Sequence, residues 1–362
     1  MKEFDEIPHS GGKITFSKGQ TTYECSNPFP VVLYEIAVSF NGIVLGRGNF
    51  GRDPVPLPSI TVMIASDREG YFGYLCPRCE KYFRATHGTA ETIICPYCMY
   101  IDNALHFLTK NQKQYIELYF KKAIEHIQTS KELCINMDEL VSQLDNNVIK
   151  LSKYEERQQR IIECTECKIK FDIIGTYAGC PRCGKRNNID HFNQEISSIQ
   201  SQHKKSKINS NTALNKIIEC YCGLGKDIKY ILEKNIPLCA ENKKIAKKID
   251  FQKVIETNSI LTQLYGLYLF PNNDKEIVTF LRLMFQRRHL IAHTGAIVDQ
   301  QYLDKTSDKT VRLGQKILIS DDDLNSFINS IKLFTSNFFK QFSSIISDYL
   351  EKSKKITNHL IY

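Results

Sequence analysis

The stretch FLRLMFQRRHLIAHTGAIVDQQYLDKT, residues 280–306, decides the fold of the C-terminal half of the chain. Its first apolar residues recur at steps of three and four, which predicts one stripe along an amphipathic helix. Two basic residues, Arg288 and His293, lie near the end of that stripe, and His289 directly follows the arginine. Gly295 suits a left-handed helix C-cap, so we expect the helix to end there.

An arginine and a histidine in one small volume can cleave RNA without a metal ion. An imidazole with a pKa near ~6.5 can take the proton from a ribose 2′-hydroxyl, and a guanidinium can hold the phosphate as charge builds on it. Basic residues also end many helices because they suit the helix dipole, so the spacing alone permits a purely structural interpretation. On an ideal helix, Arg288 and His293 lie roughly 140° apart. They converge only if the helix loosens near His293 or if a second copy contributes its own pair.

The motif and its surroundings resemble those of HEPN domains, small helical bundles common in microbial defence and toxin systems. Arg288, His289 and His293 fit the R-[N/D/H]-x3-H form of the family's R-x(4 to 6)-H signature, and RRHLIAHTGAIVD before a long final helix is similar too. The resemblance covers roughly residue 212 to the end of the chain. It implies a metal-independent endoribonuclease that dimerises and pools two motifs in one cleft, although other members cleave nothing. Arg287 is a possible substitute for Arg288, since R-x5-H also satisfies the pattern.

The composition is that of a globular protein, with 42% hydrophobic and 24% charged residues among 362. The net charge of +8 permits a polyanionic partner without requiring one. No run of 18 apolar residues and no charged-then-apolar leader occurs, so we expect a cytoplasmic protein with no membrane partner.

Eight of the 13 cysteines fall in Cys-x-x-Cys pairs, which predicts two zinc ribbons. The expected ligands are Cys76, Cys79, Cys95 and Cys98 for the first ion, and Cys164, Cys167, Cys180 and Cys183 for the second. Four thiolates leave no open position for water, so we expect two structural zinc ions per chain. Iron in a rubredoxin-like site and a redox role for the pairs are the alternatives. Aromatic and basic residues between the first knuckles, such as Tyr82 and Phe83, could contact nucleic acid or pack beneath the metal.

We therefore expect an α+β chain made of an N-terminal β region, two zinc ribbons and a C-terminal HEPN-like α-helical bundle. The predicted segments are a β-rich region at 1–75 with a hairpin at Asn41-Gly42, zinc ribbon 1 at 76–107, a helical connector at 108–160, zinc ribbon 2 at 161–193, a linker at 194–211, and the bundle at 212–362. Helix caps are predicted at Thr109, with Gln112, and at Ser320, with Asp323.

The function expected first is a metal-independent endoribonuclease of the prokaryotic defence or toxin type. In it His293 is the general base, Arg288 stabilises the phosphorane-like transition state, and His289 orients the pair or assists protonation. The partners would be RNA, a second copy of the chain, and a protein trigger or inhibitor. The alternative is a non-catalytic module, in which the ribbons bind nucleic acid or protein and the bundle only dimerises.

Overall fold

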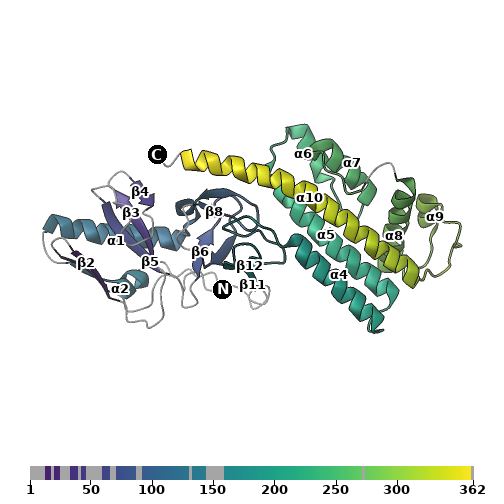
Figure 1. The fold of residues 1–362 in the computed structure, drawn as a ribbon, viewed down its shortest axis with the longest axis horizontal. Coiled ribbons are helices and arrows are strands. Elements are labelled where there is room, and N and C mark those ends of the chain that lie inside the picture. Colours follow the sequence, from purple (N-terminus) through teal and green to yellow (C-terminus); the bar gives the residue numbers. More distant parts are fainter. Residues whose placement is uncertain are drawn as a thin grey trace. The chain divides into compact units, whose positions relative to one another are not determined.

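The computed structural model shows a mixed α+β protein (Figure 1). It describes residues 13–17, 20–24, 33–39, 42–45, 59–65, 71–86, 92–129, 133–143, 159–270 and 274–359. The chain divides into two compact units, one comprising Met1–Lys185 with Ser353–Tyr362 and the other Arg186–Lys352.

The first unit contains two small antiparallel sheets from the N-terminal region. One has the order β10-β1-β2 and the other the order β4-β3-β5. The strands are β1 (Lys13–Ser17), β2 (Gln20–Glu24), β3 (Leu33–Ser39), β4 (Gly42–Leu45), β5 (Ser59–Ala65) and β10 (Leu133–Asn136). Ser39 pairs with Gly42, so the predicted hairpin is confirmed, but Gly42 begins β4 instead of occupying the turn.

Two helices follow in this unit, α1 (Lys110–Thr129) and α2 (Met137–Ser142). The predicted cap of α1 is confirmed in both directions. The backbone N–H of Gln112 donates to the Thr109 hydroxyl at 3.3 Å, and the N–H of Thr109 donates to the Gln112 side chain at 3.0 Å. The Gln112 amide also donates to the Gly73 carbonyl, which fixes the start of α1 against the first cysteine region.

The two cysteine-rich segments share one antiparallel sheet, of order β11-β12-β7-β6. Its strands are β6 (Phe72–Leu75), β7 (Tyr82–Ala85), β11 (Gln159–Glu163) and β12 (Lys170–Ile174), while β8 (Thr92–Ile94) and β9 (Ile101–Asn103) form a separate hairpin before the 3-10 helix η1 (Ala104–Phe107). Phe171 pairs with Ala85 across the junction. A two-stranded hairpin is marginal alone, so joining the two hairpins stabilises both. The segments predicted as separate ribbons thus form one module.

The second unit consists of helices in the region described. Its helices are α4 (Asn188–Lys204), α5 (Ser210–Asn235), α6 (Ala240–Lys247), α7 (Val254–Tyr265), α8 (Lys275–His293), α9 (Gln300–Thr306) and α10 (Asp321–His359), the last of which continues past this unit. Helix α5 packs against α4 and α8, and the apolar stripe of α5 is buried. The predicted cap of α10 is confirmed, because the N–H of Asp323 donates to the Ser320 hydroxyl at 3.1 Å.

The linker predicted at 194–211 is wrong. Helix α4 continues to Lys204 and packs against α5, burying Phe192, Ile196 and Ile199. These three apolar residues at steps of four and three are enough to hold one face of a helix on the bundle. The serine, glutamine and lysine residues that suggested a linker lie mainly on its solvent face.

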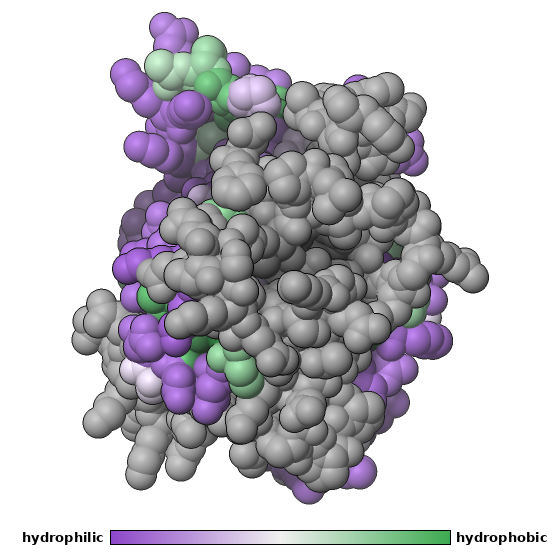
Figure 2. All heavy atoms as spheres, turned by 90° about the vertical axis from the view of Figure 1, so that its left-hand side faces the viewer, coloured by the Kyte–Doolittle hydropathy of each residue, from purple (hydrophilic) through white to green (hydrophobic). Residues whose placement is uncertain are grey.

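Polar residues dominate the described part of the face drawn in Figure 2, with small hydrophobic patches between them. Within the described residues, no helix is long and apolar enough to cross a membrane.

Candidate functional site

The four Cys-x-x-Cys turns share one backbone conformation. In each, the carbonyl of the first cysteine accepts from the N–H four residues on, and its N–H donates to the carbonyl five residues on, at 2.7–3.1 Å. The residue four positions after the first cysteine has φ of 57–81° in all four turns, at Glu80, Met99, Lys168 and Gly184. Three of these residues carry a Cβ, so the paired hydrogen bonds must hold the left-handed conformation.

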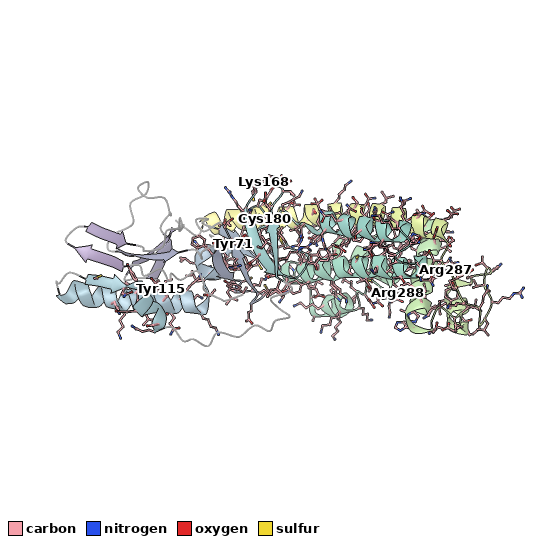
Figure 3. The ribbon with its side chains drawn as sticks, turned by 90° about the horizontal axis from the view of Figure 1, so that it is seen from below. Tyr71, Tyr115, Lys168, Cys180, Arg287 and Arg288 are labelled. Carbon is pink, nitrogen blue, oxygen red and sulfur yellow. The ribbon has the colours of Figure 1, made fainter. Side chains whose placement is uncertain are left out.

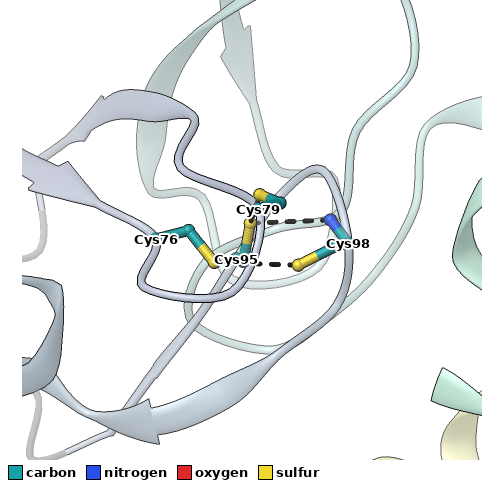
Figure 4. Close-up of side chains that lie close together, drawn as sticks. All are labelled: Cys76, Cys79, Cys95 and Cys98. Atoms are coloured by element: carbon teal, nitrogen blue, oxygen red, sulfur yellow. Dashed lines mark hydrogen bonds between the residues drawn. The ribbon is translucent and has the colours of Figure 1, made fainter. Parts of the chain in front are cut away.

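These turns gather the cysteines into two clusters, shown for the first in Figure 4. Sulfur-to-sulfur distances are 3.7 Å for Cys76–Cys98 and 3.6 Å for Cys79–Cys95. In the second cluster they are 3.5 Å for Cys164–Cys183 and 3.4 Å for Cys167–Cys180. All the sulfurs of one cluster lie within 4.8 Å of one another, and none of these cysteines forms a disulfide.

The clusters pass a geometric test for a tetrahedral metal ion. Four sulfurs at a Zn–S distance of about 2.3 Å are separated by about 3.8 Å, close to the spacing found here. The backbone N–H groups of Cys98 and Arg182 point at cluster sulfurs, which helps to stabilise thiolates. A four-sulfur set suits Zn²⁺ and also iron. The predicted ligand sets are therefore brought together as two four-cysteine clusters with metal-binding geometry.

The pKa values of the thiols also indicate that the clusters are suited to a cation. Hydrogen bonding, first from Cys76, lowers the pKa of the Cys79 thiol, whereas burial raises that of Cys95 well above its ordinary value. In the second cluster, burial raises the pKa of Cys183 to about 11. Sulfurs this close cannot all ionise without a compensating cation. A divalent ion would supply that charge.

Aromatic packing and one buried ion pair hold the two clusters in a single module. Phe83 and Phe171, which follow equivalent knuckles, are 0% and 1% exposed, so both pack inside instead of facing a ligand. The Arg84 guanidinium on β7 lies 2.6 Å from the Asp172 carboxylate on β12. The Tyr97 hydroxyl donates to the Tyr82 carbonyl and accepts from the N–H of Ile174, which joins both cysteine segments. These groups are structural.

Helix α8 carries the second candidate site, with Arg287 and Arg288 labelled in Figure 3, and continues without a break to His293. It ends where the sequence predicts: Gly295 has φ of +66°, and the N–H of Ala296 donates to the Leu290 carbonyl. The helix does not loosen near His293, so Arg288 and His293 of one chain point in directions roughly 140° apart.

The two neighbouring arginines have different surroundings. Arg287 is 8% exposed and lies 3.0 Å from the Asp323 carboxylate and 3.4 Å from that of Asp308, which also accepts from the Tyr302 hydroxyl. Arg288 is half-buried, and among the described residues it forms no ion pair, although the Nε atoms of both arginines are buried without an acceptor. The Arg287 side chain is therefore held in ion pairs within the folded bundle, whereas the Arg288 guanidinium has no such partner among the described residues and can bind an anion.

The two histidines form an exposed pair on another side of α8. Their ring centroids lie 4.6 Å apart. The pKa of His289 is below its ordinary value, first because of partial burial and then because of the positive charges of His293, Lys305 and Arg288. Its imidazole is therefore neutral near pH 7 and can accept a proton. Lys305 on α9 belongs to these surroundings, and no local pattern in the sequence marked it.

No protein-family model matches the chain, and neither a curated protein nor a solved structure matches it. Fold and sites therefore define the class directly: a mixed α+β chain with two four-cysteine clusters at metal-binding geometry and a helical unit that carries an exposed histidine pair.

Proposed function

We propose that the chain is a metal-independent endoribonuclease of the HEPN type, active in the cytoplasm as part of a prokaryotic defence or toxin system. The observation that carries the proposal is the contrast on α8. Arg287 is fixed by two carboxylates, while Arg288 lacks an ion-pair partner among the described residues and shares the helix end with an exposed histidine pair. A guanidinium without an ion pair and an imidazole that can accept a proton are the groups that phosphodiester cleavage through the 2′-hydroxyl requires.

The reaction follows from these groups. The His293 imidazole takes the proton of the ribose 2′-hydroxyl, and the 2′-oxygen attacks the adjacent phosphorus. Arg288 binds the phosphate oxygens as negative charge builds on them. The bond from phosphorus to the 5′-oxygen breaks, and the leaving oxygen takes a proton from an imidazolium, with His289 assisting. The products are a 2′,3′-cyclic phosphate and a 5′-hydroxyl, and no water is consumed.

The arginine and histidine that act together come from two copies of the chain in this proposal. The regular course of α8 separates Arg288 from His293 within one chain. Three apolar side chains in the segment between α8 and α10 are exposed, Ile297, Leu313 and Leu318, at 48%, 61% and 77%. A homodimer that buries these side chains would place a second motif nearby.

The cysteine clusters serve structure in this proposal. Each would hold one zinc ion through its four sulfurs and leave no position for a reacting water. Since the clusters share one sheet, the two ions would stabilise a single module, which we assign to recognition of RNA, a trigger or an inhibitor.

The test is cleavage of total RNA by the purified protein, with zinc bound in its clusters, in a buffer that contains no added divalent metal ion. Arg288→Ala and His293→Ala should each lower cleavage at least a hundredfold, and the exposed control Lys340→Ala should not change it. The wild-type product should carry a 2′,3′-cyclic phosphate. Cleavage that survives both substitutions would remove the mechanism. RNA binding without cleavage would favour the non-catalytic module.

A further inference from the structure

A hollow of about 520 Å³ opens between the first half of α8 and the turn that follows α9. Its apolar wall is formed by Phe280 and Leu283, both half-buried. Its rim carries three exposed cationic side chains, Lys275, Arg282 and Lys309. A hollow of this volume can hold a ligand the size of one nucleotide.

The charge in the hollow is unbalanced. Of its two acidic residues, Asp308 is engaged by Arg287, by the Tyr302 hydroxyl and by Thr310, which leaves only Glu276. The three cationic side chains are Lys275, Arg282 and Lys309. In the part of the chain that the structure describes, none of them has a carboxylate within ion-pair distance. The hollow is therefore suited to an anion that also presents a flat apolar surface.

One edge of the hollow, at Lys275 and Arg282, lies on the same side of α8 as the histidine pair. Arg282, Gln286, His289 and His293 follow one another at steps of four, three and four, so they share a face of the helix. Arg282 and His289 are separated by roughly 10 Å along the helix axis. Helix α9 packs beside α8, and its Lys305 acts electrostatically on His289 while the turn after α9 lines the hollow. Positive charge from Lys305 and Lys309 thus lies both beside the histidines and at the hollow.

We propose that this hollow binds one nucleotide of single-stranded RNA, its base against Phe280 and its phosphate between Arg282, Lys275 and Lys309. The inference rests on the proposed function, because it names the single-stranded substrate and the place where it is held beside the cleavage site. Every base has a face that can stack on an aromatic ring, so the subsite accepts different sequences. Each cation that contacts a phosphate releases counterions and makes binding depend on salt.

The experiment measures binding apart from cleavage. A fluorescent oligoribonucleotide of eight uridines is titrated into full-length His293→Ala protein, and into the same protein carrying Arg282→Ala, Phe280→Ala or the control Lys340→Ala. We expect the first two to raise the Kd about tenfold, in keeping with loss of one charged or stacking contact, and the control to leave it unchanged. Arg282→Ala should also reduce the slope of log K against log salt by about 0.7. Because Arg282 is exposed, the fold should tolerate this substitution.

Unchanged affinity and salt slope in Arg282→Ala, or no binding of the oligonucleotide at all, would overturn the subsite. A competition experiment distinguishes a nucleotide site from a simple anion site. Uridine monophosphate should displace the oligonucleotide at concentrations where inorganic phosphate does not. Equal displacement by phosphate would show that the hollow binds anions only and would overturn the proposal. The two proposals fail separately. If the protein binds RNA through Arg282 but does not cleave it, the subsite stands and the nuclease proposal fails. If cleavage requires Arg288 and is unaffected by Arg282→Ala, the nuclease proposal stands and the subsite fails.

Discussion

Replacement of Arg287 by alanine should destabilise the helical unit. The Arg287 and Asp308 side chains are 10% and 3% exposed, so the substitution leaves a carboxylate buried without its cation. Breaking such a pair costs about 3–5 kcal/mol, and we expect the lower end because Tyr302 and Thr310 still donate to Asp308. The contact with Asp323, which is 39% exposed, adds little. For a unit of this size, a loss of about 3 kcal/mol lowers Tm by roughly 6–12 °C.

The measurement is thermal unfolding of the wild type, Arg287→Ala and Arg288→Ala by circular dichroism, with urea titration as a second readout. Arg288→Ala is the matched control, since it removes the adjacent arginine without breaking an ion pair that the structure shows. It should change Tm by no more than about 2 °C. If Arg287→Ala melts like the wild type and loses cleavage, while Arg288→Ala retains it, the assignment of the two arginines is reversed.

Three further outcomes follow from the described structure. Elemental analysis should find about two zinc ions per chain. Removing the zinc with a strong chelator should unfold the cysteine module before the helical unit. A cysteine module that stays folded without metal would contradict this. By NMR, His289 should titrate below its ordinary pKa of 6.5, and His293→Gln should raise that pKa by removing repulsion; a midpoint above 6.5 in the wild type contradicts the geometry. Gly225→Ala should destabilise the bundle by about 1–3 kcal/mol, because its Cβ would lie 2.2 Å from the Phe251 ring; an unchanged urea midpoint would disprove that contact.

The cysteine clusters illustrate what spacing alone can predict. A Cys-x-x-Cys turn places its ligands locally, so all eight positions could be named from the sequence and are gathered as expected. The left-handed residue in each turn could be suspected only at Gly184. Glu80, Met99 and Lys168 have no local preference for positive φ, and hydrogen bonds made to the cysteines hold them there.

Long-range pairing explains the features that sequence did not disclose. The shared sheet depends on Phe171 lying opposite Ala85, and nothing local in either strand identifies its partner. The polar composition of α4 concealed three buried apolar residues, because a helix on the edge of a bundle needs only a narrow apolar stripe.

The candidate site on α8 also combines features that local sequence patterns predict with features that depend on the folded bundle. The helix, its end near Gly295 and the neighbouring basic residues follow from local patterns. The choice between Arg287 and Arg288 does not, since Asp308 and Asp323 reach Arg287 only in the folded bundle. The lowered pKa of His289 likewise depends on the fold, first on partial burial and then on neighbouring charges, which include Lys305 from the next helix.

The proposed site built from two chains is tested most directly by complementation. Arg288→Ala and His293→Ala chains, each inactive alone, are co-expressed with different tags and assayed on RNA as a mixed dimer population. Random pairing gives about half heterodimers, each with one complete site of two, so about a quarter of wild-type cleavage should return. Activity that stays at the level of the separate variants, in heterodimers shown to have formed, would contradict an active site shared between copies.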